Sequence, residues 1–120
     1  MAWTAAHARL LARHIPPARP PLEVSTGDRL RVGELSEEWP AFRWCSDEHG
    51  HGGWVPDRHL SHLSNGEATA LQDYDTSELA ADQGEIVSVD EPDEESGWLW
   101  CSNASGESGW IPLRWVEPVD

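Results

Sequence analysis

Short stretches of alternating hydrophobic and polar residues run through the second half of the chain. Between residues 85 and 90, Val87 and Val89 alternate with Ile86 and Ser88. A period of two is typical of a strand with one buried face. This segment is therefore predicted to be a half-buried strand.

Four further segments of this half are predicted to be extended, with polar or glycine-containing turns between them. They are residues 70–74, 97–102, 108–112 and a short closing strand within 114–118, after one helical turn. Pro112 ends its strand because proline has no backbone N–H to donate. Five short strands without a helix of normal length predict an all-β fold, a small antiparallel barrel or sandwich.

A repeat shows that this unit occurs twice. Trp44-Cys45-Ser46 and Gly53-Trp54-Val55-Pro56 recur as Trp100-Cys101-Ser102 and Gly109-Trp110-Ile111-Pro112, at an offset of 56 residues. Upstream of these strings the offset is 57, so one residue was inserted or lost in a polar loop. The repeat predicts two copies of one β-unit.

The first copy has the same pattern over residues 22–63, and residues 5–13 are predicted to be its first strand rather than a short helix. Residues 64–67, Ser-Asn-Gly-Glu, are interpreted as the linker, which reaches only about 13 to 14 Å even when fully extended. The expected fold is two tandem five-stranded small barrels packed side by side. The expected domains are residues 1–63 and 70–120, joined by a linker at 64–69.

Composition limits the function. Eight tryptophans in 120 residues supply the cores of two small domains and leave little room for an enclosed active site. Cys45 and Cys101 occupy equivalent apolar positions, which favours free, buried, structural thiols. Neither a signal peptide nor a membrane span of roughly 20 apolar residues is evident, so the expected location is the cytoplasm.

Net charge is −14, and the halves differ: residues 67–120 carry 14 acidic residues and one Arg, a net −13, which leaves −1 for residues 1–66. Nucleic acid is not an expected partner, because phosphate binding needs clustered cations. The charge favours a basic peptide or protein surface as the partner of the second half. Alternatively, the acidic residues only keep a tryptophan-rich module soluble.

Several motifs resemble one known family. They are Ala70-Leu71-Gln72-Asp73-Tyr74-Asp75, Glu78-Leu79, Gly84-Glu85, Gly97-Trp98, Gly109-Trp110-Ile111-Pro112 and Trp115-Val116. Together they resemble a Src-homology-3 (SH3) domain, of the variant SH3 family, over the whole second copy. The chain as a whole resembles a free-standing bacterial protein of two tandem SH3 domains, with a more divergent first domain.

The resemblance implies a groove that binds proline-rich peptides between aromatic rings, beside an acidic loop that pairs with a ligand Arg or Lys. Carried over by position, the expected ligand-binding residues are Tyr74, Trp98, Trp110, Pro112, Trp115, Asp75, Glu78, Asp93, Glu94 and Glu95. The family places Trp98 and Trp115 on the surface. Gln72 in place of an aromatic residue, together with a short loop at 75–83, shrinks the expected proline pocket.

The corresponding groove positions of the first copy are Ile15 or Pro17, Phe42, Pro56 and His59, a half-aliphatic set that is less suited to proline-rich peptide. The remaining repeated tryptophans, Trp44, Trp54 and Trp100, are interpreted as structural or as contacts between domains.

Residues 15–22, Ile-Pro-Pro-Ala-Arg-Pro-Pro-Leu, are interpreted as a stiff loop. The alternative is that they occupy the acidic groove of the second copy, in the same chain or in another copy, as self-inhibition or self-association. His49 and His51 lie in a Gly-rich turn, which favours solvated histidines over a metal site. Cys45 has nearby histidines but Cys101 has none in its half, which argues against a catalytic thiol.

These observations predict a non-enzymatic protein-interaction module or adaptor without cofactor or metal. It is expected to bind a proline-rich or basic peptide through its second domain, and neither nucleic acid nor membrane. Two alternatives stay open: binding of cell-wall peptides, as in bacterial relatives of the fold, and a structural or regulatory subunit that uses the seam between domains.

Overall fold

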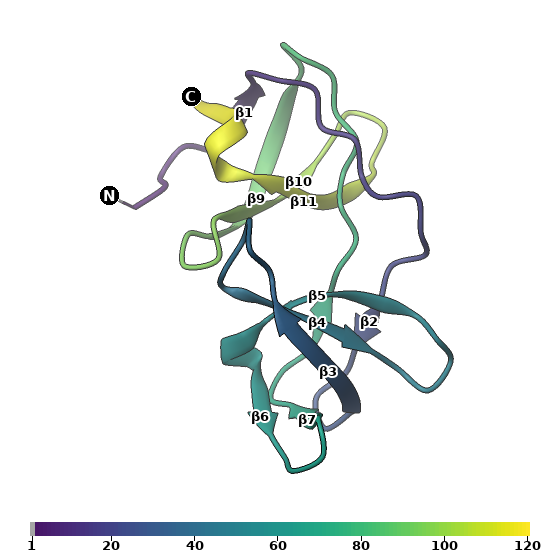
Figure 1. The fold of residues 1–120 in the computed structure, drawn as a ribbon. Helices are drawn as coiled ribbons and strands as arrows, with labels where there is room; N and C mark the ends of the chain where they lie inside the picture. Colours follow the sequence, from purple (N-terminus) through teal and green to yellow (C-terminus); the bar gives the residue numbers. More distant parts are fainter. Residues whose placement is uncertain (1) are drawn as a thin grey trace. The chain divides into compact units, whose positions relative to one another are not determined.

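The computed structural model describes residues 2–120, which form strands, turns and two short 3₁₀ helices but no α-helix (Figure 1). The all-β prediction is confirmed. No helix in this part of the chain is long and apolar enough to cross a membrane. The strands belong to two compact units: unit 1 contains the residues up to Ala18 together with Ser77–Asp120, and unit 2 is the continuous segment Arg19–Thr76.

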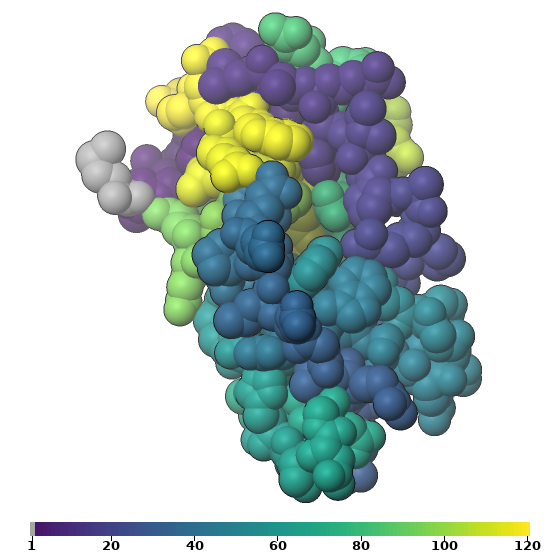
Figure 2. Space-filling view, in the orientation of Figure 1, coloured from purple at the N-terminus to yellow at the C-terminus, as the bar shows by residue number. Residues whose placement is uncertain are grey.

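Unit 1 is built around a five-stranded antiparallel sheet with the order β11-β10-β9-β1-β12. Its elements are β1 (His7–Leu10), β9 (Ile86–Asp93), β10 (Trp98–Ser102), β11 (Ser108–Pro112), the 3₁₀ helix η2 (Leu113–Trp115) and β12 (Val116–Val119). The buried core is Ala8, Leu10, Leu79, Ala81, Val87, Leu99, Cys101, Ile111 and Val116. Strands β1 and β12 of this sheet pair directly. Their pairing brings the N-terminal (purple) and C-terminal (yellow) residues together in Figure 2.

Unit 2 has its own five-stranded sheet, with the order β5-β4-β3-β7-β6, and a separate two-stranded pair, β2-β8. Its elements are β2 (Glu23–Val24), β3 (Arg29–Leu35), β4 (Phe42–Ser46), β5 (Gly52–Pro56), the 3₁₀ helix η1 (Asp57–His59), β6 (Leu60–His62), β7 (Glu67–Ala70) and β8 (Tyr74–Asp75). Within residues 2–120, neither five-stranded order closes by pairing of its two outer strands. The strand pairing therefore does not confirm the two predicted barrels.

The expected linker is part of a hairpin. Asn65 and Gly66 have φ values of 66° and 72°, and the N–H of Leu63 donates to the carbonyl of Glu67 at 2.8 Å. Asn-Gly is the most favoured dipeptide of tight hairpin turns because both residues tolerate positive φ. The chain therefore reverses at once, and β7 pairs with β6, with Leu60 opposite Ala70.

Because β7 adds to the sheet of the first copy, the first strand of unit 1 comes from elsewhere. β1 lies between β9 and β12, with Ala8 opposite Val87 on one side and Pro118 on the other. The strand predicted within residues 5–13 is confirmed, but its sheet partners belong to the second copy. The two units consequently do not follow the boundaries expected from the sequence, 1–63 and 70–120.

The exchange of first strands also redistributes charge. Unit 1 has three Arg and 11 acidic residues, a net −8, and unit 2 has five Arg and 11 acidic residues, a net −6. The contrast of −13 with −1 along the sequence is therefore nearly absent from the folded units. Net charge alone does not single out one unit as the binder of a basic ligand.

The duplicated Trp-Cys strings serve the same purpose in both units. The two thiols are fully buried and free, and burial raises the pKa of each to about 12. The adjacent tryptophans form cross-strand pairs with edge-to-face rings, Trp44 with Trp54 at 5.1 Å and Trp100 with Trp110 at 5.2 Å between centroids. The structural interpretation of both cysteines is confirmed.

Candidate functional site

Strand β1 and the residues after it match strand β7 and the residues after it without a gap. Ala8, Leu10 and His14 in one match Ala68, Ala70 and Tyr74 in the other, at an offset of 60 residues. In both segments the first two positions are buried in a core and the third forms a bridge or strand pair further along. His14 is therefore the counterpart of Tyr74.

Tyr74 lies in unit 2. Its strand β8 pairs with β2, which places Tyr74 opposite Val24 and Asp75 opposite Glu23. The buried Tyr74 ring makes an edge-to-face contact with His59, with 5.2 Å between centroids. The sequence-predicted site is thus divided: Tyr74 and Asp75 belong to unit 2, whereas the other eight residues belong to unit 1.

Asp73 helps to hold this segment in unit 2. Its carboxylate accepts hydrogen bonds from the backbone N–H and the hydroxyl of Thr26, at 2.8 and 3.0 Å. These bonds lower the pKa of Asp73, the backbone bond most. Thr76 adds a second attachment, because its backbone N–H and hydroxyl both donate to the carbonyl of Leu22, at 3.0 and 2.9 Å, and its hydroxyl accepts from the N–H of Leu22 at 2.7 Å.

His14 takes the equivalent place in unit 1. Its side chain is only 3 % exposed, and its ring lies at the edges of Trp98 and Trp115, with centroid distances of 5.9 and 5.6 Å. Nδ1 is 2.7 Å from the Leu79 carbonyl, and Nε2 is 3.0 Å from a carboxylate oxygen of Glu78. Sequence reasoning missed His14 because it assigned this segment to the first copy and placed the counterpart of Tyr74 at Ile15 or Pro17.

Trp98 begins β10, opposite Asp93 on one neighbouring strand and Pro112 on the other. It is 9 % exposed, so the expectation of a surface position is wrong for this ring. Trp115 in η2 is partly exposed. The contacts of His14 with both tryptophans explain part of this burial, because the imidazole packs against each ring.

Trp110 supports the segment that carries Glu78. Its N–H donates to the Ser77 carbonyl at 3.0 Å, and its own carbonyl accepts from the Leu79 N–H at 3.1 Å. Glu78 is thereby held beside the edge of β11 in a parallel bridge with Trp110. With an exposure of 9 %, Trp110 is a support for the site more than a contact surface.

The acidic residues after β9 form a loop next to Trp98. Ser96 donates to Asp93 through its N–H at 3.4 Å and through its hydroxyl at 3.1 Å, which closes the loop. Glu94 accepts a hydrogen bond from the N–H of Trp3, and both Glu94 and Glu95 are exposed. The structure therefore brings these residues into one unit: Glu78, Trp98 and Trp115 contact His14, and Asp93 and Pro112 lie opposite Trp98 on the neighbouring strands.

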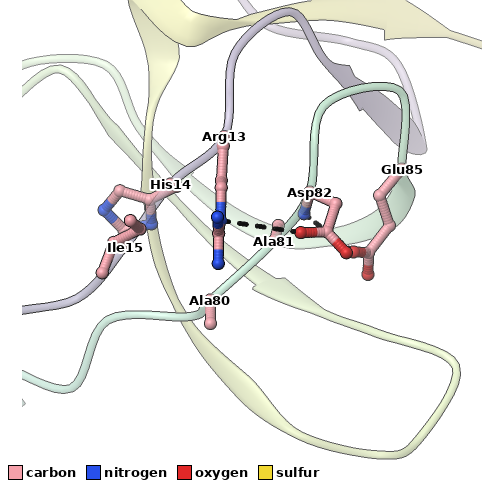
Figure 3. Close-up of a pocket in the computed structure, with 7 residues that line it drawn as sticks. All are labelled: Arg13, His14, Ile15, Ala80, Ala81, Asp82 and Glu85. Atoms are coloured by element: carbon pink, nitrogen blue, oxygen red, sulfur yellow. Dashed lines mark hydrogen bonds and ion pairs between the residues drawn. The ribbon is translucent and has the colours of Figure 1, made fainter.

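A shallow hollow of about 160 Å³ lies beside His14 (Figure 3). It is lined by residues 13–15 and by residues from 80 to 85, two segments that are joined by the β-bridge between His14 and Ala81. Arg13 and Asp82 form an ion pair of 3.8 Å across it, and Glu85 accepts from the N–H of Asp82 at 3.0 Å. Ile15, 68 % exposed, completes the wall on the His14 side.

The first-copy positions Phe42, Pro56 and His59 are all buried and share unit 2 with Tyr74. Tyr74 of the second copy thus joins the groove positions of the first copy, where the sequence analysis had placed Ile15 or Pro17. The proline-rich stretch passes from unit 1 into unit 2, where the Arg19 guanidinium lies 5.0 Å from the centre of the Trp44 ring.

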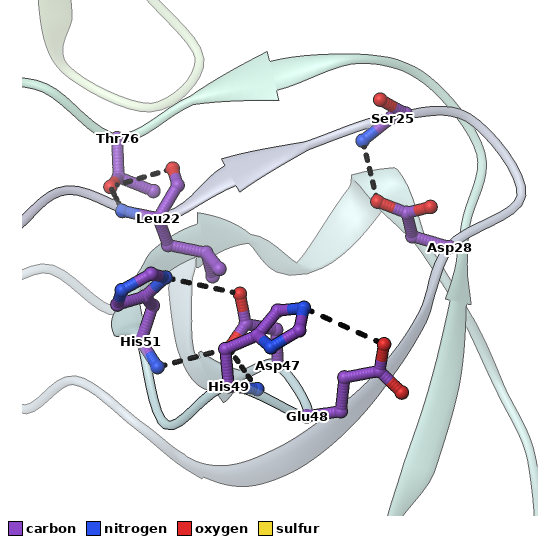
Figure 4. A network of polar contacts seen from close by, with 8 residues as sticks. All are labelled: Leu22, Ser25, Asp28, Asp47, Glu48, His49, His51 and Thr76. Carbon is purple, nitrogen blue, oxygen red and sulfur yellow. Dashed lines mark hydrogen bonds and ion pairs between the residues drawn. The ribbon is translucent and has the colours of Figure 1, made fainter.

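The histidine-containing turn between β4 and β5 has a structural explanation (Figure 4). The Asp47 carboxylate accepts from the N–H groups of His49 and His51, both at 2.9 Å. Desolvation acts to raise the pKa of Asp47, but these bonds and the nearby imidazoles outweigh it, and the pKa is lowered. Residues 2–120 contain no group of three or more His, Cys, Asp or Glu side chains placed to hold a metal ion.

Comparison with known proteins finds one family over part of the chain. Residues 69–119 match the family model of the variant SH3 domain. The match covers the whole second copy in sequence, so it begins in unit 2 and continues through unit 1. No solved structure matches the chain. SH3-type domains are typically non-catalytic modules that bind proteins or peptides, and a protein-interaction module is the general class that the match supports.

Proposed function

We propose that unit 1 is a non-catalytic binding module for a proline-rich peptide that carries Arg or Lys, and that it acts in the cytoplasm. The observation that carries the proposal is the arrangement around His14. Trp98 and Trp115 flank one imidazole, Pro112 lies opposite Trp98, and the Glu78 carboxylate is next to the same ring. Flat rings of this kind suit proline side chains, and the carboxylate suits a cation.

The acidic loop supports a basic ligand. Asp93 lies directly opposite Trp98, and the exposed carboxylates of Glu94 and Glu95 follow it. The polyproline II conformation is already extended before binding, so a proline-rich ligand loses little entropy. Carboxylates on the rim of such a site add specificity and a faster association rate more than affinity.

The test is an NMR titration of the full chain with a synthetic probe peptide of the sequence IPPARPPL, the residues 15–22 of this protein. We expect amide shifts around Trp98 and Trp115 in unit 1. Trp115→Ala is expected to weaken binding by about 2 kcal/mol, roughly 30-fold, as for a central aromatic contact. Trp54→Ala removes a partly exposed tryptophan of unit 2 and is the matched control.

A probe in which Gln replaces the arginine should bind more weakly, and binding of the arginine probe should decrease at high salt. The proposal is wrong if the probe shifts only amides of unit 2, if it shifts none, or if Trp115→Ala binds as the unaltered protein does.

A further inference from the structure

The imidazole of His14 faces an oxygen atom at each of its two nitrogens. Nδ1 lies 2.7 Å from the carbonyl of Leu79, which carries no proton, so Nδ1 must be the donor. A neutral imidazole has only one N–H, which would leave Nε2 without a proton. Nε2 nevertheless lies 3.0 Å from a carboxylate oxygen of Glu78. A hydrogen bond at this distance requires one proton, and the proton belongs on Nε2 because free imidazole is a stronger base than a free carboxylate.

We propose that His14 and Glu78 hold one proton between them and that the cationic side chain of a bound peptide displaces it, so that peptide binding is coupled to proton release. This inference rests on the proposed function and specifies how that site recognises the positive charge of its ligand. His14 is a positioning residue in this account, because it acts on the ligand through Glu78.

The other charged groups near His14 do not replace Glu78 as its partner. Trp98 and Trp115 contact the imidazole with uncharged rings. In the hollow beside the ring, Arg13 pairs with Asp82, while Glu85 accepts from the backbone N–H of Asp82. Arg114 is an exposed neighbour of Trp115 in η2.

The coupling follows from charge. With the proton in place the pair is neutral overall, and the imidazolium both compensates the carboxylate and repels an approaching cation. The Glu78 side chain is 19 % exposed, so a ligand Arg or Lys can reach it from solvent. When the cation arrives, the Nε2–H bond breaks, the electron pair stays on Nε2, and the proton passes to water.

The ring can lose this proton without leaving its place, because the Nδ1–H bond to the Leu79 carbonyl is present in both states. Affinity for a basic peptide should therefore increase with pH. One proton released per binding event sets a limit of about tenfold per pH unit.

The first arm of the test needs no ligand. Long-range ¹H–¹⁵N NMR of the His14 ring in the full chain is expected to show both nitrogens protonated at mildly acidic pH. In Glu78→Gln the side-chain amide can donate to a neutral Nε2, so Nε2 should become unprotonated under the same conditions while Nδ1 stays protonated. An unaltered protein with a singly protonated ring throughout the range from about pH 5.5 to 8.5 overturns the inference.

The second arm is calorimetric titration with the IPPARPPL probe, in buffers of different ionisation enthalpy and from about pH 5.5 to 8.5. Proton release and a rise in affinity with pH are expected for the unaltered protein, and both should be lost in Glu78→Gln and in His14→Asn, whose amide keeps a donor for the Leu79 carbonyl. His49→Asn, in the exposed turn, is the control and should behave as the unaltered protein.

The outcomes separate the two proposals. Binding of the probe without proton release, or with the same release in Glu78→Gln, overturns the inference and leaves the proposed function standing. If the probe does not bind at any pH, the proposed function is overturned, and the exchange of a proton for a cation is overturned too.

Discussion

Unit 2 interrupts unit 1 in the sequence, so the two units should depend on each other unequally. Unit 2 is one continuous segment, Arg19–Thr76, whereas unit 1 is assembled from the segments on either side of it. The hydrogen bonds between Leu22 and Thr76 hold the two ends of unit 2 together. Folded unit 2 is therefore a short connection between the two parts of unit 1, and unfolded unit 2 is a flexible loop of 58 residues.

The size of the effect follows from loop entropy. Closure of a flexible loop costs free energy in proportion to (3/2)RT ln n. With 58 residues in place of an effective connection of about five, the 19–22 segment plus Thr76, unit 1 should lose about 2 kcal/mol of stability when unit 2 unfolds. This loss corresponds to a roughly 30-fold change in the unfolding equilibrium of unit 1.

Paired core substitutions provide the perturbation. Leu30 and Leu60 are buried in unit 2, and Leu10 and Leu99 in unit 1. Each Leu→Ala change in a core costs about 3 to 5 kcal/mol, and a unit of this size is stable by only about 3 to 9 kcal/mol. Either double variant should therefore unfold its own unit.

Hydrogen exchange measured by NMR on the amides of β4 and β10 reports the two units separately. In Leu30→Ala/Leu60→Ala we expect β4 to exchange freely and β10 to lose about 2 kcal/mol of protection. In Leu10→Ala/Leu99→Ala, β10 should exchange freely while β4 keeps its protection. Equal losses in both directions, or full protection of β10 while unit 2 is unfolded, would refute the reasoning.

Three further results are expected. The fragment 19–76 should fold by itself, as measured by NMR dispersion, whereas 64–120 should not, because it lacks the first strand of unit 1. Gly66→Ala should destabilise unit 2 in urea unfolding by about 1 to 2 kcal/mol, because Gly66 has a φ of 72°; a neutral effect would argue against the turn. Cys45 and Cys101 should react with a thiol reagent only as fast as their units open. Because burial raises both pKa values from 9.0 to about 12, the thiol form stabilises the fold fully below pH 9, and stability should fall as pH rises above 9.

Local patterns predicted the elements well. Period-two alternation identified β9, and the recurrent Gly-Trp-aliphatic-Pro strings identified β5 and β11. The burial of Cys45 and Cys101 also followed from the sequence, because both occupy apolar strand positions. Each of these properties depends on which face of a strand a side chain occupies, and the sequence records that directly.

The division of the expected ligand-binding residues between the two units could not be predicted in the same way. The repeat places Tyr74 in the second copy, although the hairpin at Asn65 and Gly66 returns its segment to unit 2. Asn-Gly was the local signal for this outcome, and the gapless match of His14 with Tyr74 was the signal for the missing site residue. Both become informative only when strand partners are considered.

The amino-acid sequence was enough to predict an all-β protein, to show that Trp-Cys and Gly-Trp-aliphatic-Pro strings recur at a fixed offset, and to match one stretch to a variant SH3 domain. The folded structure was needed to show which sheet each first strand completes, how charge divides between the units, and that His14 contacts Trp98, Trp115 and Glu78. The physical reason is that a strand pattern specifies the buried face but not the neighbouring strand. A turn of a few residues closes a hairpin at small entropic cost, and the distant strand β1 then fills the place that remains.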